Sequence, residues 1–189
     1  MASTRTFVAV SPSDETRAQA AQLAAELQPF ATHIKWVVPP NLHWTLHFLG
    51  DVEDTMLPAV CDVVANAVGD FEPFLLTASG AGAFPSAERP RTLWLGTTQG
   101  TRELVALQAT VKSALDQLGF RGENRPYVPH LTLGRAGQRH NVGSMADRLA
   151  ELADYPGGST NIDEVSVLGS ELARDGPTYH LIGRAPLNG

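Results

Sequence analysis

The sequence predicts an α+β fold of two pseudo-symmetric lobes, built mostly of antiparallel sheet with flanking helices and with a cleft between the lobes. Residues 42–50 and 129–135 both contain the order His, apolar residue, Thr, Leu, and in both segments polar and apolar residues alternate. A period of two is typical of a strand with one exposed face, and such strands favour antiparallel sheets over fully covered parallel ones. Helical patterns alternate with these strands in both halves of the chain, which completes the evidence for the α+β class.

The chain of 189 residues is long enough for one domain with its own core. We therefore assign residues 1–189 to a single domain, with an internal duplication of roughly 6–84 and 91–185. The first strand, the first helix and the histidine motif each recur at a nearly constant distance along the chain (Phe7 and Leu93, Ser13 and Thr101, His43 and His130). Two such copies predict two related lobes in one compact body.

In the first half, β-branched and aromatic residues predict a strand at 6–10, and the hydroxyl- and acid-rich segment 11–15 predicts the start of a helix that continues over 18–27. The first motif predicts a strand that ends at Gly50. Apolar residues at helical spacing predict a helix over 53–68, and residues 74–78 form an extended segment.

In the second half, the patterns predict a strand at 92–96, a helix over 101–118 ended by Gly119, a strand over the second motif and a helix at 144–153. Further strands are expected at 162–168 and 179–182. Residues 80–90 and 155–159 are rich in glycine and proline, so both are expected to be loops.

Composition restricts the class of protein. The formal net charge is −6 and the sequence pI is about 5.4, which argues against a protein that coats nucleic acid by bulk charge. Cys61 is the only cysteine, so the chain has no internal disulfide and no cysteine metal cluster. Since no apolar run approaches a membrane span or a signal peptide, we expect a cytoplasmic monomer with no membrane contact.

The chemistry is indicated by the paired histidines. Histidine exchanges protons near neutral pH, and two of them supply the base and the acid that an in-line displacement at phosphorus needs without a metal ion. If the lobes face each other, His43 and His130 lie on opposite sides of one cleft. Thr45 and Thr132, two residues further along each strand, then lie on the same faces and can hold phosphoryl oxygens.

Other side chains near the motifs are candidates for phosphate or substrate binding. Arg135 has an odd spacing from His130 that a regular strand would send to the opposite face, and a bulge at Gly134 would relax this constraint. His47 shares a face with His43 by simple alternation, and Phe48 falls on the apolar face. The candidate substrate contacts are His47, Phe48, Arg91 and Tyr127. The spacing of His43 and His47 resembles a zinc-binding pair, but such a pair needs a helix and a nearby carboxylate, so no metal is expected.

With these residues the chain resembles the two-histidine (2H) phosphoesterases, and within them the bacterial RNA 2',3'-cyclic phosphodiesterases, also described as 2'-5' RNA ligases. Residues 41–50 look like the first motif of this family, residues 84–96 like its intervening segment and residues 129–135 like its second motif. The resemblance implies hydrolysis of a terminal 2',3'-cyclic phosphate to a 2'-phosphate, without a cofactor. It also implies that His43 protonates the leaving 3'-oxygen and that His130 activates water, because pseudo-symmetry alone does not assign these roles.

The expected partner is RNA with a 2',3'-cyclic phosphate end or a small cyclic nucleotide, and ligation through a 2'-5' bond would be the reverse reaction. Two alternatives stay open at this point. The first alternative is a phosphodiesterase that acts on another small cyclic phosphate or on a 2'-5' linkage. The second is a module that binds nucleotides or RNA ends without catalysis.

Overall fold

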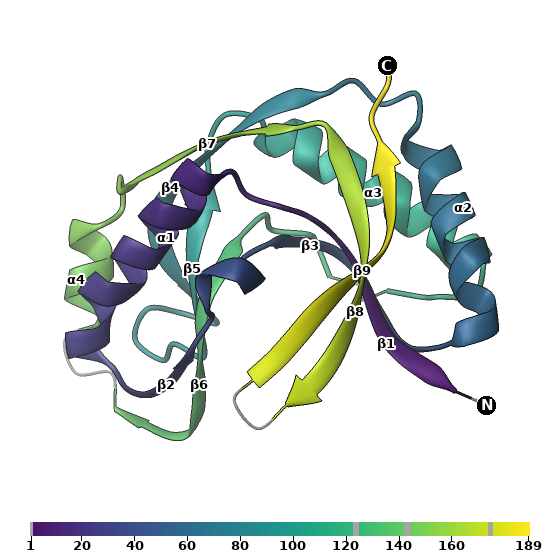
Figure 1. Ribbon diagram of the computed structural model, residues 1–189. Coiled ribbons are helices and arrows are strands. Elements are labelled where there is room, and N and C mark those ends of the chain that lie inside the picture. The colour runs from purple at the N-terminus through teal and green to yellow at the C-terminus, as the bar shows by residue number, and fades with distance from the viewer. Residues whose placement is uncertain (1, 123–124, 142–144, 174–175) are drawn as a thin grey trace.

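Two antiparallel sheets form the framework of the molecule, with helices on their outer sides (Figure 1). They are seen in a computed structural model that describes residues 2–122, 125–141, 145–173 and 176–189. In chain order the helices and strands are β1 (Ser3–Val10), α1 (Asp14–Leu27), β2 (Thr32–Trp36), β3 (Trp44–Glu53), α2 (Leu57–Val68), β4 (Phe74–Phe84), β5 (Thr92–Thr97), α3 (Thr101–Gln117), β6 (Leu131–Asn141), α4 (Met145–Glu151), β7 (Pro156–Ile162), β8 (Glu164–Ala173) and β9 (Gly176–Pro186).

Each sheet forms one lobe. The four-stranded sheet has the order β3-β1-β8-β9 and packs against α2 and α3, whereas the five-stranded sheet has the order β2-β6-β5-β4-β7 and packs against α1 and α4. Figure 1 shows α1 and α4 on one flank of the molecule and α2 and α3 on the other, with the strands between them. The predicted α+β fold with two lobes is confirmed.

The lobes are not the two halves of the chain. β1 and β3 come from the first half but share a sheet with β8 and β9, and β2 and β4 share a sheet with β5, β6 and β7. Each lobe is therefore complete only when both halves of the chain contribute strands.

The helices form where the apolar spacing predicted them. Val60, Val64 and Val68 of α2 are fully buried, as are four residues of α3 that recur every three or four positions (Leu104, Leu107, Val111 and Leu115). The start of α1 is fixed by Ser13, whose side chain accepts a hydrogen bond from the Thr16 N–H. Burying each of these large apolar side chains contributes about 1.5–3 kcal/mol to folding.

Matching bulges interrupt the two motif strands, and β3 has a further bulge at Leu49. Between β1 and β3, Val8 pairs with His47 and Ala9 with Thr45, so Leu46 has no partner on β1. Between β5 and β6, Leu93 pairs with Gly134 and Trp94 with Thr132, so Leu133 is left without a partner on β5 in the same way. An extra residue in a strand reverses the faces of all residues that follow it.

Two strands were missed by the sequence patterns. The segment 155–159 was expected to be a loop, but β7 begins at Pro156 and pairs with β4. Gly157 serves close packing there rather than a turn, because a Cβ at this position would lie 2.8 Å from the Cβ of Ala78. β2 was not predicted at all, and β4 extends through most of the glycine-rich segment that was expected to be loose.

None of the helices in the described part of the chain is long and apolar enough to cross a lipid bilayer.

Candidate active site

His43 and His130 each stand directly before a strand, and the two strands belong to different sheets. His43 precedes β3 and His130 precedes β6, and these strands contact each other where the lobes meet. The rings are close enough for a positive charge on His130 to lower the pKa of His43. The structure therefore brings the two predicted histidines together.

Both rings are held by the same local hydrogen bond. Nδ1 of His43 lies 2.7 Å from the carbonyl oxygen of Asn41, and Nδ1 of His130 lies 2.7 Å from the carbonyl oxygen of Val128. Since a carbonyl oxygen only accepts, each Nδ1 carries the proton and donates it. This fixes the tautomer, so that Nε2 is the nitrogen left to exchange a proton with a ligand in both rings.

The pKa of each histidine is lowered from its ordinary value. Burial is the main cause for both His43 and His130, and it outweighs the opposite effect of the carbonyl hydrogen bonds. The positive charge of Arg135 lowers the pKa of both rings further, and Arg125 adds to the effect on His130. Without a bound anion, both imidazoles are therefore mainly neutral at pH 7.

Aromatic side chains form the walls beside the rings. The His43 ring lies 4.9 Å from that of Phe7 and 5.3 Å from that of Tyr179, and the His130 ring lies 5.0 Å from that of Phe84 (centroid distances). Phe7 and Tyr179 also contact each other. Sequence reasoning missed Phe7 and Tyr179, which lie on strands far from the motifs in the chain, and included Phe84 only as part of the segment 84–96.

The two threonines keep the positions that alternation predicted. Thr45 and Thr132 are half-buried, and each is the last residue before the bulge of its strand, so it shares a face with the histidine two residues earlier. Neither hydroxyl makes a hydrogen bond to another residue in the described part of the chain. Both are available to a ligand next to the histidines.

After the bulges the two strands present different side chains at equivalent positions. Arg135 lies on the face of His130 and Thr132, and its Nη1 donates to Oγ1 of Thr92 across 3.4 Å. The predicted bulge is confirmed, although the residue skipped is Leu133 and not Gly134. Phe48 takes the equivalent position on β3, where it is 56% exposed and contacts Phe7. The prediction that Phe48 lies on the apolar face is wrong.

His47 is turned away from the site, so the prediction that it shares a face with His43 is also wrong. Its side chain is only 4% exposed, and its Nε2 hydrogen bonds to the carbonyl oxygen of Phe120 across 3.0 Å. The bulge at Leu46 is the cause, because it directs His47 toward α3. The pKa of His47 is lowered, mainly by burial.

The other two candidate substrate contacts, Arg91 and Tyr127, are not directed toward the two histidines by any described contact. The main chain of Arg91 bonds to Phe84 and Ala136, which aligns β4, β5 and β6, while its side chain is exposed. The hydroxyl of Tyr127 is buried without a hydrogen-bond partner in the described chain, and burial raises its pKa. In this conformation the hydroxyl of Tyr127 is not accessible to a substrate.

The described residues contain no group of three His, Cys, Asp or Glu side chains that is arranged to hold a metal ion. His43 and His47, which have the spacing of a zinc pair, face opposite sides of β3 and do not share a ligand position.

The chain is similar to known phosphoesterases over nearly its whole length. A profile of the LigT-like phosphoesterase family matches it twice, at residues 10–94 and 95–179. The RNA 2',3'-cyclic phosphodiesterase of Methanothermobacter thermautotrophicus is 36% identical over 175 residues, which cover 93% of this chain and 94% of that protein. The protein of the same name from Archaeoglobus fulgidus is 33% identical over 175 residues, which cover 93% and 96%.

Solved structures agree with the sequence comparison. The crystal structure of E. coli LigT complexed with 3'-AMP superimposes with a TM-score of 0.79 at 26% identity, and all of both chains is covered. The same protein complexed with phosphate gives a TM-score of 0.73 at 25% identity with the same coverage.

Proposed function

The chain belongs to the LigT-like phosphoesterase family, and from this premise we propose that it hydrolyses 2',3'-cyclic phosphate ends of RNA to 2'-phosphomonoesters. His43 and His130 act as acid and base, and no metal ion takes part. The observation that carries the proposal is the matched pair of histidines, each with Nδ1 bound to a carbonyl oxygen and Nε2 left for the reaction.

The proposed reaction is an in-line displacement at phosphorus. Nε2 of His130 takes a proton from a water molecule, whose oxygen attacks the phosphorus atom. The bond between phosphorus and the 3'-oxygen breaks, and His43 donates the proton that this oxygen needs to leave as a hydroxyl group. The product carries a 2'-phosphate, and exchange with solvent restores the protonation of both rings.

Substrate binding favours the positively charged form of His43. Burial and Arg135 keep both rings mainly neutral in the free protein. A bound phosphodiester places a negative charge beside them, and an opposite charge at this distance raises the pKa of a histidine. Substrate binding therefore favours the one protonation that the acid role needs.

Threonine hydroxyls and Arg135 hold the phosphoryl group in the proposed complex. Thr45 and Thr132 donate to its non-bridging oxygens from the two strands, and the guanidinium of Arg135 balances its charge. The exposed ring of Phe48 offers a surface on which a nucleobase can stack. The exposure of this ring supports a nucleotide substrate over a phosphodiester that carries no base.

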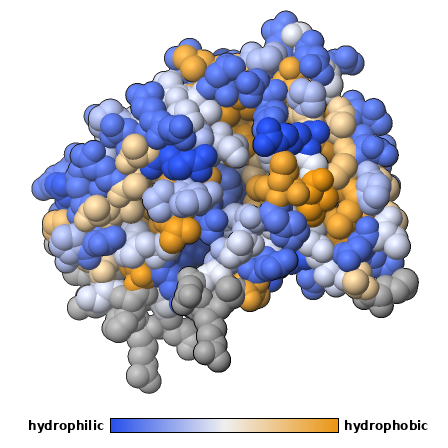
Figure 2. Space-filling model, viewed as in Figure 1, coloured by the Kyte–Doolittle hydropathy of each residue, from blue (hydrophilic) through white to orange (hydrophobic). Residues whose placement is uncertain are grey.

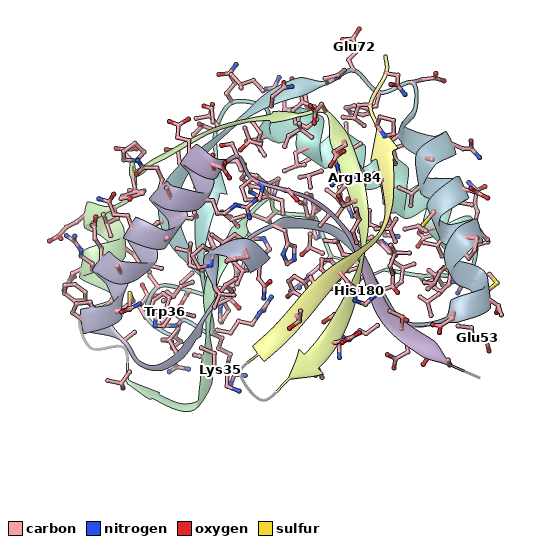
Figure 3. All side chains as sticks on the ribbon, viewed as in Figure 1. Lys35, Trp36, Glu53, Glu72, His180 and Arg184 are labelled. Atoms are coloured by element: carbon pink, nitrogen blue, oxygen red, sulfur yellow. The ribbon has the colours of Figure 1, made fainter. Side chains whose placement is uncertain are left out.

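The proposal is tested with a nucleoside 2',3'-cyclic phosphate and with an RNA oligonucleotide that ends in one, both in excess EDTA. We expect turnover to the 2'-phosphate, identified by phosphorus NMR. His43→Ala and His130→Ala should each lower kcat/KM by about 10²-fold or more. His180→Ala is the matched control, since His180 is an exposed histidine of β9 (Figure 3) that lies beside Glu171 and contacts neither His43 nor His130.

Four results would contradict the proposal or its substrate. Full activity in either histidine variant would exclude the acid and base roles, and loss of activity in EDTA would exclude a metal-free reaction. Tight binding without turnover across a panel of cyclic phosphates and 2'-5' linkages would show a binding module instead. Faster hydrolysis of a 2'-5' linkage than of RNA cyclic ends would move the substrate class.

A further inference from the structure

Two positive side chains stand directly opposite each other on neighbouring strands. Lys35 of β2 pairs with Arg135 of β6 in the antiparallel register, so both side chains project from the same face of the five-stranded sheet. The neighbours of Lys35 on β2, Ile34 and Trp36, pack against the core on the other face. Figure 3 shows Trp36 directed toward α1.

This face is the one that carries the site. Arg135 shares it with His130 and Thr132, and the charge of Arg135 reaches His43 and Tyr179 of the other lobe. Lys35 therefore extends the positive charge of the site outward by one strand, at the edge of the five-stranded sheet.

The equivalent row of the other lobe is apolar. On the four-stranded sheet, Phe48 pairs with Phe7, Phe7 with Leu168 and Leu168 with Leu181, and Leu181 is 48% exposed. In Figure 2 the larger hydrophobic area lies over the four-stranded lobe, and the other lobe is mostly hydrophilic. β3 is the edge of its sheet, so β2 and Lys35 have no counterpart there.

Nothing in the described chain neutralises the pair. No carboxylate among the described residues lies within ion-pair distance of Lys35 or Arg135, although the chain as a whole is acidic. Like charges directly opposite each other destabilise a sheet. An anion bound between Lys35 and Arg135 would attract both side chains and so offset their mutual repulsion.

We propose, resting on the proposed function, that Lys35 binds the phosphodiester on the 5' side of the terminal nucleotide in an RNA chain, next to Arg135, which holds the terminal cyclic phosphate. The RNA then leaves the site across β6 and β2, along the charged wall and not along the apolar one. The preferred substrate is accordingly an RNA end of two or more nucleotides, and a cyclic mononucleotide lacks the second phosphate that this subsite binds.

The test compares two substrates in the same enzyme, a nucleoside 2',3'-cyclic phosphate and a short RNA oligonucleotide that ends in the same cyclic nucleotide. In Lys35→Ala, the ratio of kcat/KM for the oligonucleotide to kcat/KM for the mononucleotide should fall about tenfold, mainly through KM, as expected for one charged contact. The salt dependence of kcat/KM for the oligonucleotide should also become less steep by about 0.7 in the log–log slope.

Two variants serve as controls. Arg102→Ala removes one exposed positive charge from α3, outside the site, and should leave the ratio unchanged. Lys35→Arg keeps the charge and should keep the ratio. The thermal midpoint of Lys35→Ala without substrate should equal or exceed that of the wild type, because the like-charge pair is relieved.

An unchanged ratio in Lys35→Ala, or an equal fall in Arg102→Ala, would overturn this subsite while leaving the proposed function intact. If the wild-type enzyme turns over neither substrate, the proposed function fails and this inference fails with it.

Discussion

At the scale of single residues, Thr45 and Thr132 are the simplest side chains of the site to replace. Each hydroxyl lies on the face of a histidine and makes no hydrogen bond within the described chain. In the proposed complex each donates to an anionic phosphoryl oxygen, a type of hydrogen bond that contributes about 1.5–3 kcal/mol.

Thr45→Val and Thr132→Val should therefore each lower kcat/KM for the cyclic phosphate by about 10- to 100-fold. Valine has nearly the same shape as threonine, so the free energy of unfolding should change little. Thr45→Ser is the matched control and should retain most of the activity. Wild-type kcat/KM in both valine variants would exclude these hydroxyls as phosphate ligands.

Arg135 should set the pH range of the reaction. The kcat/KM profile reports the free enzyme, in which one ring must be neutral and the other protonated. Both pKa values lie below the ordinary histidine value, so the optimum of kcat/KM should lie below pH 6.5. Arg135→Gln removes a positive charge that disfavours the protonated form of both histidines, so both pKa values should rise. The bell-shaped profile of kcat/KM against pH should then move to higher pH.

The measurement is kcat/KM against pH for wild type and Arg135→Gln, together with NMR titration of the two rings. Arg102→Gln controls for a remote change of charge. A profile that stays in place, or moves to lower pH, would show that Arg135 does not act on the histidines.

At the scale of elements, the two bulges decide which side chains reach the site. The period-two pattern correctly predicts that Thr45 shares a face with His43, and Thr132 with His130, because these residues precede the bulges. The pattern assigns His47 and Phe48 to the wrong faces of β3, because both residues follow the bulge at Leu46. The sequence contains no local signal for the bulge at Leu46, since its position is set by the pairing with β1, a strand from elsewhere in the chain.

The same reason explains the other differences at this scale. Tyr179 and Phe84 reach the histidines only through the arrangement of β9 and β4 in the sheets, which no local pattern encodes. β7 was mistaken for a loop because glycines that permit close packing look like glycines that form turns. Helices, by contrast, were predicted well, since their apolar spacing is local.

Replacing His47 tests whether this side chain stabilises the fold, as its buried position indicates, or contacts the substrate. Replacing it with alanine leaves the carbonyl oxygen of Phe120 buried without its partner, so His47→Ala should lower the free energy of unfolding by about 1–3 kcal/mol. The folded variant should keep kcat/KM within about threefold of the wild type. Urea unfolding and steady-state kinetics measure the two effects.

The exposed His180 provides the comparison, since His180→Ala should change stability by less than about 0.5 kcal/mol. If His47→Ala were as stable as the wild type but lost activity, His47 would be a substrate contact after all.

At the scale of the whole molecule, each of the two lobes contains strands from both halves of the chain. The sequence predicted a duplication of roughly 6–84 and 91–185, and an independent repeat would fold alone. Here, residues 1–86 contain β1 and β3 without β8 and β9, and β2 without the β6 strand that it pairs with.

A fragment of residues 1–86 should therefore show no cooperative unfolding transition, whereas the full chain should unfold in one. Urea titration followed by circular dichroism measures both. Mixing the fragment of residues 1–86 with a fragment of residues 87–189 should restore structure, because the second fragment supplies the missing strands. A cooperative transition in the first fragment alone would show that the halves are independent units.

The pairing of β1 with β8 also has a consequence for synthesis on the ribosome. β1 is synthesised well before β8, so the edge of β1 that pairs with β8 stays unpaired until the residues between the two strands have been translated. Contacts so distant in sequence slow folding and prolong the exposure of a strand edge. The nascent chain thus carries an open, apolar β1 edge until β8 has been made, and Tyr179 joins His43 only after β9, which follows β8, has been made.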